Sequence, residues 1–172
     1  IMNLKQLGAF VGTNSVVTRS NFRHLPQLAT LLVRLGVERY QFAFVHAVGR
    51  AGRNFESVVP RKSLCEPYIK AGLDVGLAAG REAMTEAVPW CFMRGYEPCI
   101  SETVMPDTSI YDAGHVIDDF RQFRLVKGKA KGEPCAQCTY ESVCEGPWRE
   151  YPERYGWGEF IPRTDPLPQG GR

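Results

Sequence analysis

The sequence lacks the features that assign many proteins to a membrane or to a nucleic acid. It has no apolar run of the roughly 18 residues that a membrane-spanning helix needs, and no charged and apolar leader opens it. It also has little excess of either charge, because 21 Lys and Arg stand against 19 Asp and Glu. We therefore expect a cytoplasmic protein with no membrane partner, and nucleic acid is not an expected partner.

The composition is also unlike that of a disordered or fibrous chain. Of 172 residues, 44% are hydrophobic and 23% are charged, which excludes an intrinsically disordered chain, a coiled coil and a collagen-like repeat. The length suits one domain or slightly more, with a hydrophobic core of its own.

Two successive segments predict a parallel α/β fold. The phrases QLGAFVGTNSVV and RLGVERYQFAFV repeat one order, in which the end of a helix is followed by a glycine and then by a strand. We expect strands over 9–18 and 39–48, joined by a helix whose leucines recur every three or four residues before Gly36. Alternation of strands and helices is typical of a parallel sheet.

A third unit follows a long polar segment. We expect a loop over 50–66, a helix over 67–79 and a short strand over 84–88. Because Cys91 comes directly after this strand, its sulfur should lie at the carboxyl end of the sheet, where ligands of parallel α/β proteins gather. Later in the chain the helical pattern is weak, and only 115–126 is expected to form a helix.

Half of the cysteines are clustered near the end of the chain. The segment CAQCTYESVCEG contains Cys135, Cys138 and Cys144 in the spacing Cys-x2-Cys-x5-Cys. In a cytoplasmic chain, where thiols are kept reduced, such clustering favours a metal site over disulfides. Both a structural zinc ion and a 4Fe-4S cluster require a fourth ligand.

Three other cysteines are candidates for that fourth ligand. Cys91 is the best placed, since it follows a buried strand, whereas Cys99 lies in the loop after Gly95 and Cys65 lies in the longer loop before it. Each of the three is equally a candidate for a buried apolar filler, because free cysteine is among the most buried residue types. No second Cys-x2-Cys and no downstream histidine is present, which argues against a zinc ribbon or finger.

The order of these motifs resembles a known family. NSVVTRSN, LGVERYQFAFVHAVGRA, PWCFM and Cys-x2-Cys-x5-Cys-Glu-Gly, over about residues 1–162, look like the C-terminal half of radical S-adenosylmethionine enzymes with a SPASM- or twitch-type auxiliary region. The resemblance implies the C-terminal part of a partial (β/α)6 TIM-like barrel with a small cysteine-rich appendage. It also implies an auxiliary 4Fe-4S cluster, held by the three clustered cysteines and Cys91.

The sequence departs from this family at two points. The Cys-x3-Cys-x2-Cys loop that binds the radical-generating cluster is absent, and Trp148 stands where a full SPASM pattern continues with a cysteine. We therefore expect a reduced, twitch-like site and a chain that is inactive alone. Its expected partners are the missing N-terminal half with its S-adenosylmethionine, an electron donor, and an unknown substrate that is a peptide or a small molecule.

The resemblance also divides the chain into parts. We expect a partial β/α barrel over 1–105, a helix and basic linker over 106–134, an iron-sulfur appendage over 135–162 and a flexible tail over 163–172. Four aromatic residues should pack the appendage against the barrel, or else line a groove for a peptide. These residues are Trp148, Tyr151, Tyr155 and Trp157.

Candidate contacts to S-adenosylmethionine are less specific. If the resemblance holds, Thr18 and His46 lie at carboxyl ends of barrel strands, near the adenosine moiety. Asn21 is better explained as a helix N-cap. Arg50 and Arg53 suit either a bound carboxylate or phosphate, or a solvated loop.

Two alternatives come from other classes. One is a non-enzymatic α/β domain with a structural zinc site. The other is a nucleic-acid-binding module that uses the basic residues between positions 121 and 131, which are Arg121, Arg124, Lys127, Lys129 and Lys131.

Overall fold

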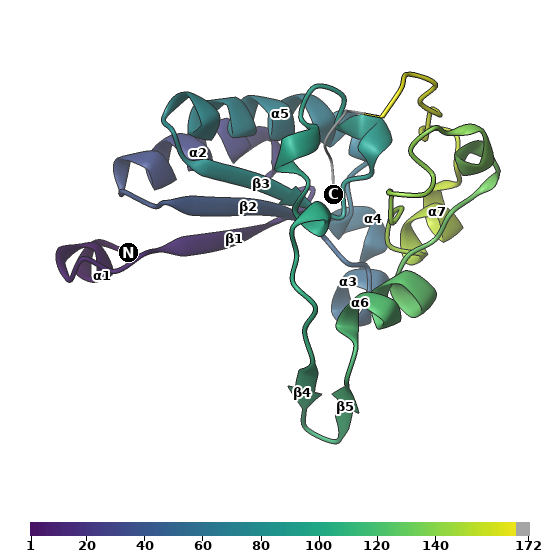
Figure 1. Cartoon of the computed structure of the whole chain (residues 1–172), viewed down its shortest axis with the longest axis horizontal. Coiled ribbons are helices and arrows are strands. Elements are labelled where there is room, and N and C mark those ends of the chain that lie inside the picture. Colours follow the sequence, from purple (N-terminus) through teal and green to yellow (C-terminus); the bar gives the residue numbers. More distant parts are fainter. Residues whose placement is uncertain (168–172) are drawn as a thin grey trace.

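The computed structural model describes residues 1–167, apart from the side chains of Asp112 and His115. A three-stranded parallel sheet has the order β1, β2, β3 (Figure 1). The predicted α/β class with parallel strands is therefore confirmed, although three strands close no barrel. The strands are β1 (Gly12–Val17), β2 (Arg39–Phe44) and β3 (Glu82–Glu86).

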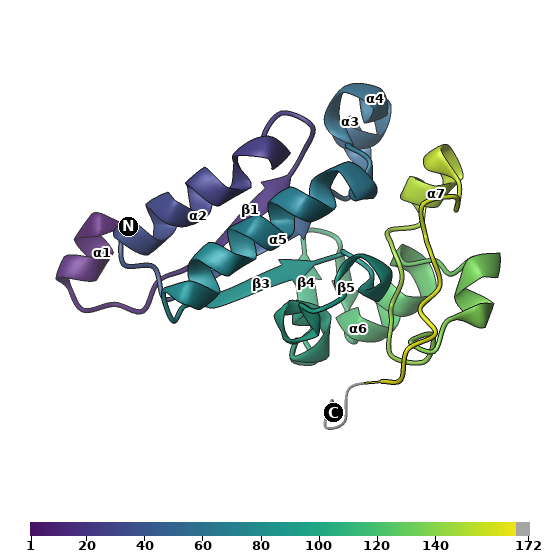
Figure 2. The ribbon, with the colours of Figure 1, turned by 90° about the horizontal axis from the view of Figure 1, so that it is seen from above.

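Two helices cover the same face of this sheet (Figures 1 and 2). They are α2 (Leu25–Arg34) and α5 (Lys62–Ala78), which pack on each other. The predicted leucine stripe explains the packing of α2, because Leu25 and Leu32 are buried in the core. On the opposite face of β1, Val16 is 50% exposed. One face of the sheet thus forms the core, while the other meets solvent at this edge.

Two glycines allow α5 to lie unusually close to β2. A Cβ atom on Gly72 would come within 2.6 Å of the Phe42 ring, and one on Gly76 within 2.3 Å of the Tyr40 hydroxyl. The Tyr40 hydroxyl donates a hydrogen bond to the Gly72 carbonyl. Close packing of α5 on the central strand therefore requires glycine, which has no side chain, at both positions.

Several expected boundaries are wrong in the segment between β2 and β3. Residues 50–66 are largely helical rather than a polar loop, since α3 (Gly49–Arg53) and α4 (Phe55–Val58) occupy the first half. Helix α5 begins at Lys62, five residues before the proline that was expected near its start, so Pro67 lies inside it. Apolar contacts of its buried face outweigh the hydrogen bond that the proline cannot donate.

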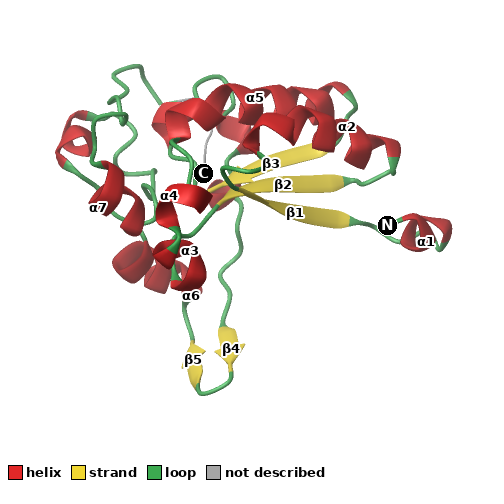
Figure 3. Cartoon of the chain, turned by 180° about the vertical axis from the view of Figure 1, so that it is seen from behind, coloured by secondary structure: helices red, strands yellow, loops and turns green. Residues whose placement is uncertain are grey.

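The expected helix over 115–126 is wrong at its beginning. Residues 115–117 form β5 (His115–Ile117), which pairs antiparallel with β4 (Ile110–Asp112) in a projecting hairpin (Figure 3). Helix α6 (Phe120–Phe123) begins only after Asp119. The carboxylate of this N-cap residue accepts a hydrogen bond from the Gln122 amide. The turn of Gly114, at φ +103°, favours the hairpin over a continuous helix.

The remaining elements are short. The chain begins with α1 (Met2–Gln6), ended as predicted by Gly8 at φ +71°. No helix among residues 1–167 combines the length and apolarity needed to cross a membrane. The short helical turns are η1 (Phe22–His24), η2 (Trp90–Phe92), η3 (Glu97–Cys99), η4 (Ser101–Thr103), the π-helical η5 (Arg124–Gly128) and η6 (Glu133–Gln137), and the last helix is α7 (Glu150–Tyr155).

We call residues 1–105 the sheet lobe and residues 124–165 the cysteine lobe. The cysteine lobe lies beside the carboxyl ends of the strands (Figure 1). Aromatic pairs join the two lobes: the ring centroids are 4.0 Å apart in His46 and Trp148, which stack, 5.5 Å in Phe44 and Tyr151, and 4.9 Å in Phe55 and Tyr155. Trp157, the fourth expected packing residue, instead contacts Phe160 within the cysteine lobe.

The beginning of the expected flexible tail is anchored. The Arg163 guanidinium is 4% exposed and contacts Glu97, Asp165 and the Tyr140 hydroxyl. These bonds tie the tail to both lobes through buried polar groups, a pattern that composition does not show. Residues 168–172 of the same expected tail lie outside the described residues.

Candidate metal centre

Four of the six cysteines line one cavity. Its open volume is about 30 Å³, and its walls include Cys91, Cys135, Cys138 and Cys144. This volume exceeds the roughly 10–15 Å³ that a single water requires. The remaining wall is mostly apolar or small, and includes Pro89, Trp90, Pro147 and Phe160.

The four thiols come from two distant parts of the chain. Cys91 lies in η2, immediately beyond the carboxyl end of β3, as the sequence predicted. The other three lie on one compact loop, where the Cys138 amide donates to the Cys135 carbonyl at 3.0 Å and the Cys144 amide donates to the Tyr140 carbonyl at 2.9 Å. Successive tight turns therefore bring closely spaced cysteines to the same cavity.

Backbone amides donate hydrogen bonds to two of the sulfur atoms. The Gly146 amide lies 3.4 Å from Cys144 Sγ, and the Arg163 amide lies 3.4 Å from Cys138 Sγ. Gly146 has φ +83°, and a Cβ atom there would come within 2.1 Å of the Ala130 carbonyl oxygen, so only glycine fits. Such N–H donors stabilise negative charge on ligand sulfurs.

The thiols also influence one another electrostatically. Burial raises the pKa of the Cys91 thiol to about 12, with further contributions from Cys144, Cys135 and Cys138. Burial likewise raises the pKa of Cys144, whereas hydrogen bonds from the Trp90 and Gly146 amides lower it. Four thiolates without a cation would repel one another here, so the arrangement suits thiolates that share a positive centre.

The two other candidates for the fourth ligand lie elsewhere. Cys65 is fully buried on α5, where burial raises the pKa of its thiol to about 12. Cys99 is buried in η3, and burial followed by the charge of Asp74 raises the pKa of its thiol. Neither residue lines the cavity. The structure thus brings Cys91, and neither of these, to the clustered cysteines.

A zinc ion and a 4Fe-4S cluster require different arrangements of their ligands. Among residues 1–167, no three His, Cys, Asp or Glu side chains are close enough together to hold a single metal ion. Zinc bound at about 2.3 Å from each sulfur requires its ligands to be nearly in contact with one another. In a 4Fe-4S cluster each thiolate binds a different iron, so the four sulfurs surround a wider volume.

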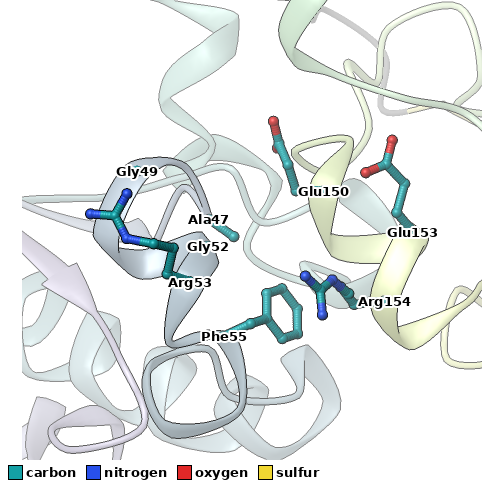
Figure 4. Close-up of a pocket in the computed structure, with 8 residues that line it drawn as sticks. All are labelled: Ala47, Gly49, Gly52, Arg53, Phe55, Glu150, Glu153 and Arg154. Atoms are coloured by element: carbon teal, nitrogen blue, oxygen red, sulfur yellow. The ribbon is translucent and has the colours of Figure 1, made fainter.

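A second cavity, of about 340 Å³, lies between the end of β2 and α7 (Figure 4). Arg53, one of the predicted anion-binding residues, lines it, and Arg154 of α7 points toward the Phe55 ring at 5.6 Å from its centroid. Glu150 also lines this cavity, and its Oε2 lies 3.2 Å from His46 Nε2. Charged groups of both signs therefore border this cavity.

The predicted cofactor contacts are occupied by local partners. The His46 ring stacks on Trp148 and pairs with Glu150, and the Thr18 hydroxyl lies 2.9 Å from the Ser20 hydroxyl. Asn21 does not cap a helix with its side chain, because its Oδ1 accepts from the Thr18 amide. Thr18, His46 and Arg50 line neither cavity.

Most basic residues of the segment between positions 121 and 131 form ion pairs. Arg124 forms a two-point hydrogen bond with Glu145, at 2.7 and 2.6 Å, and is 2% exposed. Lys129 pairs with Glu102, and Lys131 pairs with Glu141. Three of the five basic residues of this segment are therefore paired with carboxylates, which leaves fewer of its cations for contacts to phosphates.

Sequence reasoning missed several charged residues that are buried near the two lobes' contact. Arg163, Lys62 and Glu102 are all nearly buried, yet each looks like an ordinary surface residue in the sequence. Comparison with known protein families, with curated proteins and with solved structures gives no match. The function is therefore inferred from the geometry of the chain itself.

Proposed function

We propose that this chain binds one 4Fe-4S cluster through Cys91, Cys135, Cys138 and Cys144. The observation that carries the proposal is the convergence of these four thiols, from segments more than forty residues apart, on one cavity. Four cysteines are the usual ligand set of such a cluster. The amide donors to two of the sulfurs also agree with a cluster, because such hydrogen bonds stabilise the negative charge of ligand sulfurs.

The residues around the cavity have complementary roles in this proposal. The Gly146 and Arg163 amides offset the negative charge of two thiolates. Trp90 and Phe160 limit the access of water, and the paired Lys131 and Glu141 also line the cavity. A 4Fe-4S cluster supplies one-electron transfer when it is bound. Hydrogen bonds and limited solvent access are the features by which a protein sets the potential of that transfer.

We further propose that the chain is the auxiliary-cluster portion of a radical S-adenosylmethionine enzyme. Three parallel strands with helices on a single face would suit part of a TIM-like barrel, whose strands carry helices on their outer side. The half-exposed Val16 on the other face of β1 agrees with a surface that other chain segments cover. In this proposal the Cys-x3-Cys-x2-Cys motif, absent from these 172 residues, belongs to another part of the enzyme.

S-adenosylmethionine would then bind near the carboxyl ends of β1 and β2, where Thr18 and His46 lie. Both side chains have local partners, namely Ser20 for Thr18 and Glu150 for His46. The substrate class stays a peptide or a small molecule, and the electron donor is a further expected partner.

The test is the metal content and visible spectrum of protein purified and reconstituted without oxygen. We expect about four irons per chain and a broad visible absorbance, as for one cubane cluster. Cys91→Ala should lose iron and colour. Cys99→Ala is the matched control, because it removes a buried thiol of the same lobe that does not line the cavity.

Other results would refute specific parts of this proposal. One zinc per chain and no colour would establish the structural zinc alternative. Loss of iron in Cys99→Ala but not in Cys91→Ala would refute the ligand assignment. Full iron content in Cys138→Ala would refute the role of the clustered cysteines.

A further inference from the structure

Ala87 has an unusual backbone conformation. It is the one residue other than glycine with a positive φ, +56°, among residues 1–167. The left-handed region costs an L residue free energy, and such residues persist only where their surroundings hold them. Ala87 directly follows β3 and precedes Cys91 by four residues, so its conformation sets the direction in which the chain leaves the sheet.

Two charged side chains hold the peptide groups of Ala87. Lys62 Nζ donates a hydrogen bond to the Ala87 carbonyl at 2.8 Å, and Glu102 Oε1 accepts one from the Ala87 amide at 2.7 Å. The bond to the Glu102 carboxylate is charge-assisted, and such bonds are about twice as strong as neutral ones. Lys62 and Glu102 thus hold the carbonyl and the amide of the strained residue, one on each side of its Cα atom.

Lys62 has no evident reason to be buried other than this contact. Its side chain is 1% exposed, and Nζ lies 3.2 Å from the centroid of the Phe44 ring and 4.8 Å from that of Tyr151. The Ala87 carbonyl is its hydrogen-bond acceptor. A lysine buried among aromatic rings is costly unless it is paired, so its position indicates a specific task.

Glu102 extends the arrangement to the cysteine lobe. The oxygen that accepts from Ala87 lies 3.3 Å from Lys129 Nζ, and that ammonium group lies 4.1 Å from the centroid of the Trp148 ring. The next residue, Ala130, donates its amide to the Pro147 carbonyl, on the loop that follows Cys144. The Cys91 segment and the clustered cysteines are therefore joined through Glu102.

We propose that Lys62 and Glu102 are positioning residues, which clamp Ala87 in the left-handed conformation and so direct Cys91 toward the other three thiols. The significance of this clamp for metal binding rests on the proposed function. The placement of Cys91 itself concerns only residues of this chain. The two can therefore be tested separately.

The decisive experiment measures Cys91 in iron-free protein. Each variant is treated with iodoacetamide, and the alkylation rate of Cys91 is compared with that of Cys135 in the same molecule by peptide mass spectrometry. In Lys62→Met and Glu102→Ala, we expect the Cys91 rate to rise on the order of five- to thirtyfold, the factor by which an L residue disfavours the left-handed conformation. Lys70→Met is the control, since Lys70 lies on the same helix but pairs with Glu66.

A second substitution distinguishes positioning from general destabilisation. Glycine adopts the left-handed conformation without cost, so Ala87→Gly should return the Cys91 rate toward that of wild type in the Lys62→Met background. A variant that had merely lost folding would gain nothing from that change. Thermal unfolding of each variant checks that the fold is present.

The outcomes separate the two proposals. Unchanged Cys91 rates in both clamp variants, or no recovery on adding Ala87→Gly, would overturn the clamp. Iron-free wild type after reconstitution would refute the proposed function while the alkylation rates still decide the clamp. In reconstituted protein, faster loss of iron to a chelator in Lys62→Met, reversed by Ala87→Gly, supports both.

Discussion

The sheet lobe and the cysteine lobe are stabilised in different ways. In the sheet lobe, aliphatic residues such as Leu25, Ile69 and Leu73 fill the core between the strands and two helices. The branched aliphatic residues of the cysteine lobe are all at least 40% exposed, and they are Leu125, Val126, Val143 and Ile161. Aromatic rings and buried charges, among them Tyr140 and Arg163, occupy its interior instead.

This difference shows what the cysteine lobe requires. A short lobe whose branched aliphatic residues are exposed gains little from burying them, and buried ion pairs contribute little net stability because desolvation offsets their attraction. Small lobes of this kind are commonly stabilised by a metal. The comparison therefore predicts that the two lobes respond differently to removal of iron and to substitution.

In protein that holds the proposed cluster, the largest effect should follow removal of its iron. Because the four thiols join Cys91 to the cysteine lobe, chelation should abolish the protection of the 135–146 amides from hydrogen exchange, while amides of β2 keep theirs. Hydrogen exchange with mass spectrometry, on protein with and without iron, measures both regions at once. Equal loss of protection in β2 would contradict the division into two differently stabilised lobes.

The next largest effect is expected from Arg163→Met. The change leaves Glu97, whose side chain is 15% exposed, without its cation, and such a loss costs about 3 kcal/mol, the lower end of the range for buried pairs, since Asp165 is partly solvated. Urea unfolding followed by tryptophan fluorescence measures it. Arg94→Met is the control, because Arg94 pairs with the same aspartate but is 67% exposed, and its pair should be worth less than about 1 kcal/mol. Equal losses in the two variants would contradict the role of burial.

Glycine substitutions should distinguish the lobes at a smaller scale. In Gly76→Ala the new methyl group meets the buried Tyr40 ring, and in Gly132→Ala it meets the Trp157 indole at 2.3 Å. Each should lower stability by about 1–3 kcal/mol through overpacking. We expect Gly132→Ala alone to lower iron content as well. Gly158→Ala, where no atom lies within 4 Å, should change neither property. Iron loss in Gly76→Ala would show that the lobes are not independent.

The sequence was informative about the sheet lobe, where periodicity reports burial directly. The leucines of α2, the glycine that follows them and the parallel strands were predicted correctly, although Pro67 misplaced the start of α5. The convergence of Cys91 with the clustered cysteines was expected, since both a strand end and a short spacing can be read locally. The roles of Lys62 and Arg163 could not be predicted, because each depends on contacts between residues far apart in the chain.

The last expected effect is a pH dependence of stability at Lys62, which contacts aromatic rings of both lobes. Burial lowers the pKa of Lys62 well below its ordinary value of 10.5. Between these two pKa values the unfolded chain binds more protons than the folded protein, so stability rises with pH, by at most about 1.4 kcal/mol per pH unit. Lys62→Met removes this dependence. In iron-free protein, urea unfolding from pH 7 upward should therefore show wild type gaining stability relative to Lys62→Met as the pH approaches 10.5. A difference that does not change with pH would show that the ammonium group stays charged in both states, and that the aromatic rings of Phe44 and Tyr151 compensate for its burial.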